Sequence, residues 1–60
     1  MDKVYGVYKD HLIIETKYHW GYEVVAIHDH EETIRKKLIG YNLKERVKII
    51  HDAINERLTP

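Results

Sequence analysis

A chain of 60 residues without a single cysteine has few ways to stabilise a fold. A folded domain of this length buries only about 60% of the surface that its unfolded chain exposes, so its core is small. Natural domains of this size compensate with disulfides, a bound metal, self-association or very dense packing of large apolar side chains. Because the missing cysteines exclude disulfides and cysteine-ligated metals, self-association and dense packing are the predicted sources of stability.

Charge and hydropathy disfavour two broad classes of protein. Ten Lys and Arg residues balance ten Asp and Glu residues, so no whole-molecule field directs the chain to nucleic acid or to an anionic membrane. The longest apolar runs, residues 12–14 and 24–27, are far shorter than the roughly 18 residues of a membrane helix. Residues 1–6 contain no apolar stretch of signal-peptide length. We therefore expect a cytoplasmic protein that does not contact a membrane.

The first half of the chain has the pattern of an antiparallel meander. Residues 3–9 and 12–18 are rich in β-branched and aromatic side chains, and the polar break at 9–11 predicts a hairpin between them. The pair Trp20 and Gly21 predicts a second tight turn, after which residues 22–28 form a third strand.

Alternation along the strands divides this meander into two faces if the turns contain two residues. One predicted face carries Tyr5, Val7, Leu12, Ile14, Tyr18, Val25 and Ile27. The other carries Val4, Gly6, Tyr8, Ile13, Tyr22, Val24 and Ala26. A three-residue second turn would exchange the two sets on the third strand.

Residues 32–40 allow two interpretations. Asp29 and Glu32 at capping-box spacing, lysines at 36 and 37, and Gly40 are typical of a helix. The strand interpretation has Thr33, Ile34, Ile39 and Tyr41 in its favour, and the apolar stripe of the helix would be thin. We favour the strand, because it completes a four-stranded meander.

The last element is an amphipathic helix over residues 43–57. Asn42 and Glu45 form a predicted capping box, and apolar residues recur at helical spacing in Leu43, Val47, Ile50, Ile54 and Leu58. The predicted fold is therefore a single α+β domain over residues 1–60, with a small antiparallel meander of three to four strands and one C-terminal helix packed on one face.

Metal binding and catalysis are not predicted. The histidines and carboxylates at His28, Asp29, His30, Glu31, Glu32 and His51 are types that zinc or nickel accepts, but their spacing is not diagnostic and fits an exposed polar turn. The chain has no serine or cysteine, and Thr16, Thr33 and Thr59 lie in no recognisable nucleophile setting. We expect no catalytic residue, no cofactor and no tight zinc or nickel site.

One helix can cover only one face of the sheet, which leaves a candidate interface. We expect the helix to cover the face of Val7, Leu12, Ile14 and Val25. The candidate interface is then Val4, Tyr8, Ile13, Trp20, Tyr22 and Val24, in which Trp20 is of a type enriched at binding hot spots. A two-fold dimer is the commonest way to bury such a face. The sequence thus predicts a non-enzymatic protein-interaction or regulatory module that forms a homodimer.

Two further expectations concern origin and an alternative partner. Abundant Ile, Lys and Tyr is typical of AT-rich genomes, such as those of many phages. Abundant Lys and Glu with few thermolabile residues is equally typical of thermophile proteins, so composition leaves both origins open. The alternative function is nucleic-acid binding, in which bases stack on aromatic residues that lie beside lysines. The residues concerned are Tyr5, Tyr8, Tyr18, Trp20 and Tyr22, with Lys3, Lys9, Lys17 and the run from Arg35 to Lys37.

Overall fold

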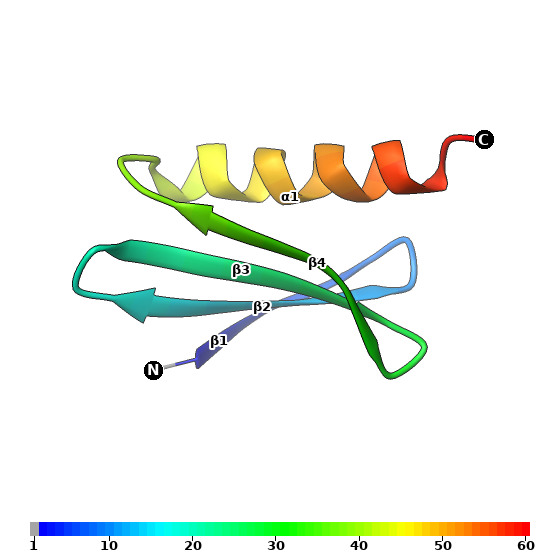
Figure 1. The fold of residues 1–60 in the computed structure, drawn as a ribbon, viewed down its shortest axis with the longest axis horizontal. Coiled ribbons are helices and arrows are strands. Elements are labelled where there is room, and N and C mark those ends of the chain that lie inside the picture. The colour runs from blue at the N-terminus through cyan, green and yellow to red at the C-terminus, as the bar shows by residue number, and fades with distance from the viewer. Residues whose placement is uncertain (1) are drawn as a thin grey trace.

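The computed structural model describes residues 2–60 and has the predicted α+β fold (Figure 1). Its four strands are β1 (Asp2–Tyr8), β2 (His11–Tyr18), β3 (Gly21–His28) and β4 (Glu31–Leu38), and α1 (Leu43–Leu58) follows. The strands form one antiparallel sheet in the order β1-β2-β3-β4. The strand interpretation of the ambiguous segment is therefore confirmed.

Two-residue turns close the hairpins of the sheet. The first turn consists of Lys9 and Asp10, and the third consists of Asp29 and His30. Both residues of each turn have positive φ, which two-residue hairpin turns need when their twist matches that of the strands. The second turn lies at His19 and Trp20, one residue earlier than predicted. This shift changes the pairing by an even number of residues, so side chains predicted to share a face on β2 and β3 still do so.

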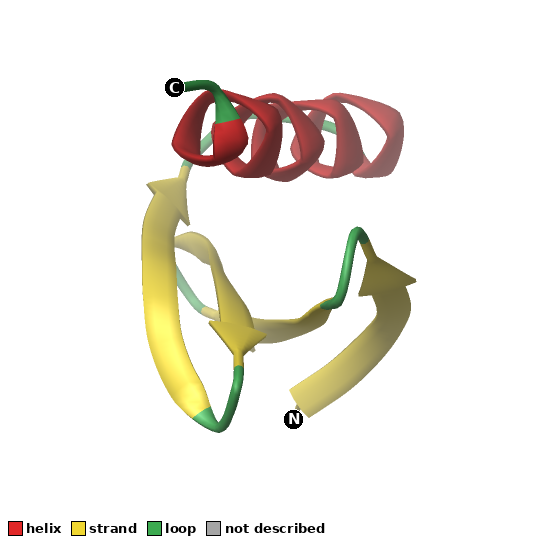
Figure 2. Cartoon of the chain, turned by 90° about the vertical axis from the view of Figure 1, so that its right-hand side faces the viewer, coloured by secondary structure: helices red, strands yellow, loops and turns green. Residues whose placement is uncertain are grey.

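The sheet curls, and α1 lies across its concave side (Figure 2). We call this side the inner face. Six apolar residues are buried between sheet and helix: Ile13, Val24, Ala26, Leu38, Ile50 and Ile54. Tyr5, Tyr8, Ile34 and Ile49 pack around them and complete the core.

The predicted choice of helix-covered face is wrong. Ile13 and Val24, two residues of the candidate interface, are 1% and 0% exposed under α1. The partly exposed aliphatic residues are instead those of the opposite, outer face, such as Ile14 and Val25. Both faces carry apolar residues at strand spacing, so hydrophobic alternation does not distinguish them. A polar contact also joins the helix to the inner face, because Glu15 of this face pairs with Arg46 of α1.

A β-bulge in β1 changes the faces of two residues. The register shifts between Val4 and Gly6, so that Val4 lies opposite Ile14 on the outer face. Tyr5, the extra residue, packs against the core and donates a hydrogen bond to Glu15. The sequence-based assignment of Val4 and Tyr5 to faces is therefore also wrong. Gly6 has a φ of 118°, a conformation that glycine adopts at little cost in free energy, and it therefore favours the bulge at this place.

Gly21 is required by a close approach of two strands. A Cβ atom at this position would lie 2.5 Å from the carbonyl oxygen of Leu38, and φ is 149°. Gly6 is a matched control, because its φ is also positive but no atom lies within 4 Å of an added Cβ. We expect Gly6→Ala to cost about 1 kcal/mol and Gly21→Ala clearly more, as measured by thermal unfolding. Equal losses would contradict the close approach.

The start of α1 is as predicted from the sequence. The Asn42 side chain accepts a hydrogen bond from the Glu45 backbone at 2.8 Å, and the Glu45 carboxylate accepts one from the Asn42 backbone at 3.0 Å. The capping box is thus confirmed. In the part of the chain that the structure describes, no helix has the length and apolar character needed to cross a membrane.

Candidate functional site

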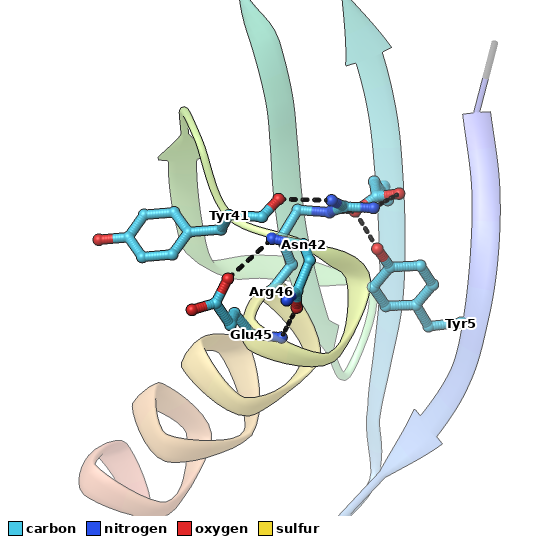
Figure 3. A network of polar contacts seen from close by, with 6 residues as sticks. Tyr5, Tyr41, Asn42, Glu45 and Arg46 are labelled. Atoms are coloured by element: carbon cyan, nitrogen blue, oxygen red, sulfur yellow. Dashed lines mark hydrogen bonds and ion pairs between the residues drawn. The ribbon is translucent and has the colours of Figure 1, made fainter.

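A buried ion pair joins the sheet to the first turns of α1 (Figure 3). Arg46 donates from Nε to Oε2 of Glu15 at 2.6 Å and from Nη2 to Oε1 at 3.4 Å. Its Nη1 donates to the carbonyl oxygen of Tyr41 at 2.8 Å. Tyr5 adds a hydroxyl donor to the same carboxylate, and the Arg46 guanidinium lies 3.5 Å from the centre of the Tyr22 ring. Both charged groups are therefore paired and hydrogen-bonded, as buried charges require.

Sequence reasoning missed this pair, although the sequence contains a signal for it. Glu15 has the same strand parity as the core residue Ile13, and Arg46 precedes Ile50 and Ile54 at intervals of four residues on the helix. Each charged residue thus occupies an apolar position of its own element. Two opposite charges placed in this way predict a buried ion pair between the two elements.

A pair of stacked histidines lies near the C-terminal end of α1. His11 is fully buried, and its ring stacks on that of His28 with 4.7 Å between centroids. Nδ1 of His11 donates to the carbonyl oxygen of Lys9 at 2.7 Å, because a carbonyl can only accept. In neutral His11 this leaves Nε2 as the acceptor that faces Arg57 Nη1 at 3.4 Å. The ring is therefore held by packing and by two polar contacts.

The candidate metal-binding residues do not lie together. His28 faces His11, His30 is an exposed turn residue with φ of 67°, and His51 stacks on Tyr8 at 3.9 Å. Within residues 2–60, no group of three His, Asp or Glu side chains has an arrangement that could hold a metal ion. The absence of a tight zinc or nickel site stays a prediction, which calorimetric titration tests.

The aromatic residues do not form an open platform. Tyr5, Tyr8 and Tyr22 contact helix-side groups on the inner face. Tyr18 and Trp20 stack on each other with 5.0 Å between centroids at the tip of the second hairpin, where Trp20 is half-buried. Of these five rings Tyr18 is the exposed one, at 41%. The nucleic-acid alternative, which needs aromatic rings exposed beside lysines, stays a prediction.

The outer face of the sheet remains uncovered by α1 and is convex (Figure 2). Val4 and Val7, both on β1, are 60% and 69% exposed and are the most exposed aliphatic side chains of the sheet. We use the name outer apolar surface for six residues of this face: Val4, Val7, Leu12, Ile14, Val25 and Ile27.

Charged residues border this surface on the β3 and β4 side. Arg35 forms ion pairs with Glu23 and Glu32. The hydrogen bonds from Arg35 hold the pKa of the Glu32 carboxyl below its ordinary value, with an added contribution from the charge of Arg35. The same bonds raise the pKa of Arg35, as does the negative charge of Glu23. One guanidinium thus faces two carboxylates, so these three groups together carry one net negative charge.

Two open depressions lie between β1 and the first half of α1. One has a volume of about 390 Å³ and is lined by residues of β1 together with Leu43, Val47 and His51. The other has a volume of about 380 Å³ and is bordered by Lys3, Leu43 and the Glu15–Arg46 pair. The helix packs chiefly against β3 and β4, which leaves this space over β1 open.

These features define a small α+β domain, a four-stranded antiparallel meander closed on one side by a C-terminal helix. No protein-family model matches the chain, and no curated protein or solved structure is significantly similar to it.

Proposed function

We propose that this chain is a small non-enzymatic protein-interaction module that acts as a homodimer in the cytoplasm. The observation that carries the proposal is the outer apolar surface, with two aliphatic side chains of β1 more than half exposed. Exposed apolar patches of this kind mark association sites in proteins. A closed two-fold dimer is the commonest assembly that buries one.

The small core adds a reason for self-association. Only six apolar residues are buried among residues 2–60, and natural domains of this length often gain stability from an oligomer interface. A standard interface removes about 800 Å² of surface from each partner. That is nearly a fifth of the 4428 Å² that the described chain exposes, so an interface of this size would cover a large share of a small molecule.

The polar groups support a binding role rather than catalysis. Glu15 and Arg46 are engaged with each other, and the Nδ1 and Nε2 atoms of His11 both have partners. A general acid or base needs a proton position open to substrate, which these buried groups do not offer. A regulator or inhibitor carried by a phage or another mobile element fits the size and composition of the chain.

Val7→Lys tests the proposed interface. We expect the variant to fold but to dissociate, with the dimer dissociation constant raised about tenfold or more, since an interface would have to bury the added charge. Size-exclusion chromatography at matched concentrations measures the change. Ile39→Lys is the control, because Ile39 in the loop after β4 is 68% exposed, as Val7 is, but lies off the outer apolar surface. Equal behaviour of the two variants would contradict the proposal.

A further inference from the structure

We propose that two copies of the chain pair their β1 strands antiparallel, across a two-fold axis that passes between Tyr5 and Gly6. The pairing depends on the homodimer proposed above and specifies the surface that forms it. It joins the two sheets into one of eight strands.

The two edge strands of the sheet differ in their protection against pairing. Five of the eight residues of β4 are charged, and charged side chains on an edge strand discourage pairing with another chain. Only Asp2 and Lys3 are charged among the seven residues of β1. β1 also carries Val4 and Val7, the most exposed aliphatic residues of the sheet. The open edge of β1 is therefore the better site for an added strand.

The bulge favours one kind of added strand. From Lys3 to Tyr8 it gives β1 a sequence of faces that is the same in both directions: outer for Val4 and Val7, and inner for Lys3, Tyr5, Gly6 and Tyr8. A regular strand matches these faces only by leaving one residue of β1 unpaired, as β2 leaves Tyr5. A second copy of β1 can pair every residue from Lys3 to Tyr8, because it carries the same irregularity at the same place.

This symmetry selects one register. Val4 lies opposite the partner's Val7, Lys3 opposite the partner's Tyr8, and Tyr5 opposite the partner's Gly6. A shift by one residue in either direction would place outer-face residues opposite inner-face residues. The selected register also places the aromatic side chain of Tyr5 opposite an edge glycine, which is a favourable cross-strand pair.

The backbone of β1 is suited to the same register. Tyr8 and His11 flank a two-residue turn, and such residues form a hydrogen-bonded pair. The N–H and C=O groups of the preceding residue, Val7, therefore point to the open edge. Beyond the bulge, Val4 takes the corresponding position, because the extra residue Tyr5 shifts the alternation of the strand by one. Val4 and Val7 are the two residues that the selected register makes partners.

The shape of the sheet favours edge pairing over packing of the two outer faces. The outer face is convex, and two convex surfaces touch over a small area (Figure 2). The edge of β1 is accessible, because α1 packs chiefly on β3 and β4 and leaves the two depressions over β1. Edge pairing would also bring Val4 and Val7, the most exposed aliphatic side chains of the sheet, against the partner's Val7 and Val4.

Disulfide trapping tests the pairing, since the chain contains no cysteine of its own. The variants Val4→Cys and Val7→Cys are oxidised mildly, each alone and as an equimolar mixture. Opposite residues of paired strands lie about 5.5 Å apart between Cα atoms, within the range of a disulfide. Val4 and the partner's Val4 would be about 10 Å apart, which is too far. We expect covalent dimers in the mixture and none in either variant alone.

Val25→Cys is the matched control, because Val25 lies on the outer face of β3, away from the edge. Cross-linking of Val25→Cys alone, without cross-linking of the β1 mixture, would show packing of outer faces. That result would overturn the edge pairing and keep the homodimer. Cross-linking of Val4→Cys alone as readily as the mixture would overturn the register. A wild-type chain that sediments as a monomer would overturn the homodimer itself.

Discussion

Ile50→Asp is expected to unfold the domain. Ile50 is 0% exposed and lies in the core between α1 and the sheet. Arg46, one turn earlier on the same helix, is already paired with Glu15. An unpaired charge in such a place costs about 4 kcal/mol or more, which is comparable with the whole free energy of unfolding of a small domain. Far-UV circular dichroism and urea unfolding measure the loss. A cooperative melt close to that of the wild type would show that the helix stripe faces solvent.

The neighbouring residues Ile13 and Ile14 provide a matched pair for the same core. From sequence alone, Ile13→Lys is expected to dissociate a dimer and leave the monomer folded. The structure reverses this expectation, because Ile13 is buried under α1 and Ile14 lies on the outer face. Ile13→Lys should therefore unfold the chain, and Ile14→Lys should leave it folded. Similar unfolding curves for the two variants would contradict the observed faces.

Arg46→Met is expected to destabilise the domain by about 3–5 kcal/mol, since it leaves the buried Glu15 carboxylate without its cation. Glu15→Gln in the same chain should recover part of the loss, because an amide is cheaper to bury than a carboxylate. Urea unfolding of the single and double variants gives the coupling free energy of the pair.

Lys48→Met is the control for this measurement. Lys48 forms an ion pair with Asp52 on the same helix at 2.6 Å, but both side chains are largely exposed. The loss of such a pair costs about 0.5 kcal/mol or less. If Arg46→Met were as mild as Lys48→Met, the Glu15–Arg46 pair would not hold the helix on the sheet.

The strands, the turns and the helix follow from local patterns in the sequence. Alternation and turn residues predict the first three strands, and the capping residue Asn42 with the stripe through Ile50 predicts the helix. These features depend on contacts between residues that are near in sequence, which is why they can be predicted. The second turn begins one residue earlier than predicted, but the side chains predicted to share a face on β2 and β3 still do so.

The faces could not be predicted in the same way. Which side of the sheet α1 covers depends on contacts far apart in sequence, such as Arg46 with Glu15 and Tyr8 with Asn55. The bulge at Tyr5 has only Gly6 as a local signal. Of the candidate interface, Ile13 and Val24 belong to the core, while Val4 lies on the outer apolar surface. One helix does leave one face of the sheet uncovered, but it is the face that was expected to lie under the helix.

Sedimentation equilibrium of the wild-type chain tests the homodimer most directly. Over a concentration series that reaches tens of micromolar, roughly the range of a moderate dimer, we expect a mass twice the 7.2 kDa of one chain. The mass should fall toward 7.2 kDa on dilution, and Val7→Lys should shift that fall to higher concentration. A mass of 7.2 kDa at every concentration would contradict the homodimer and with it the pairing of β1 strands.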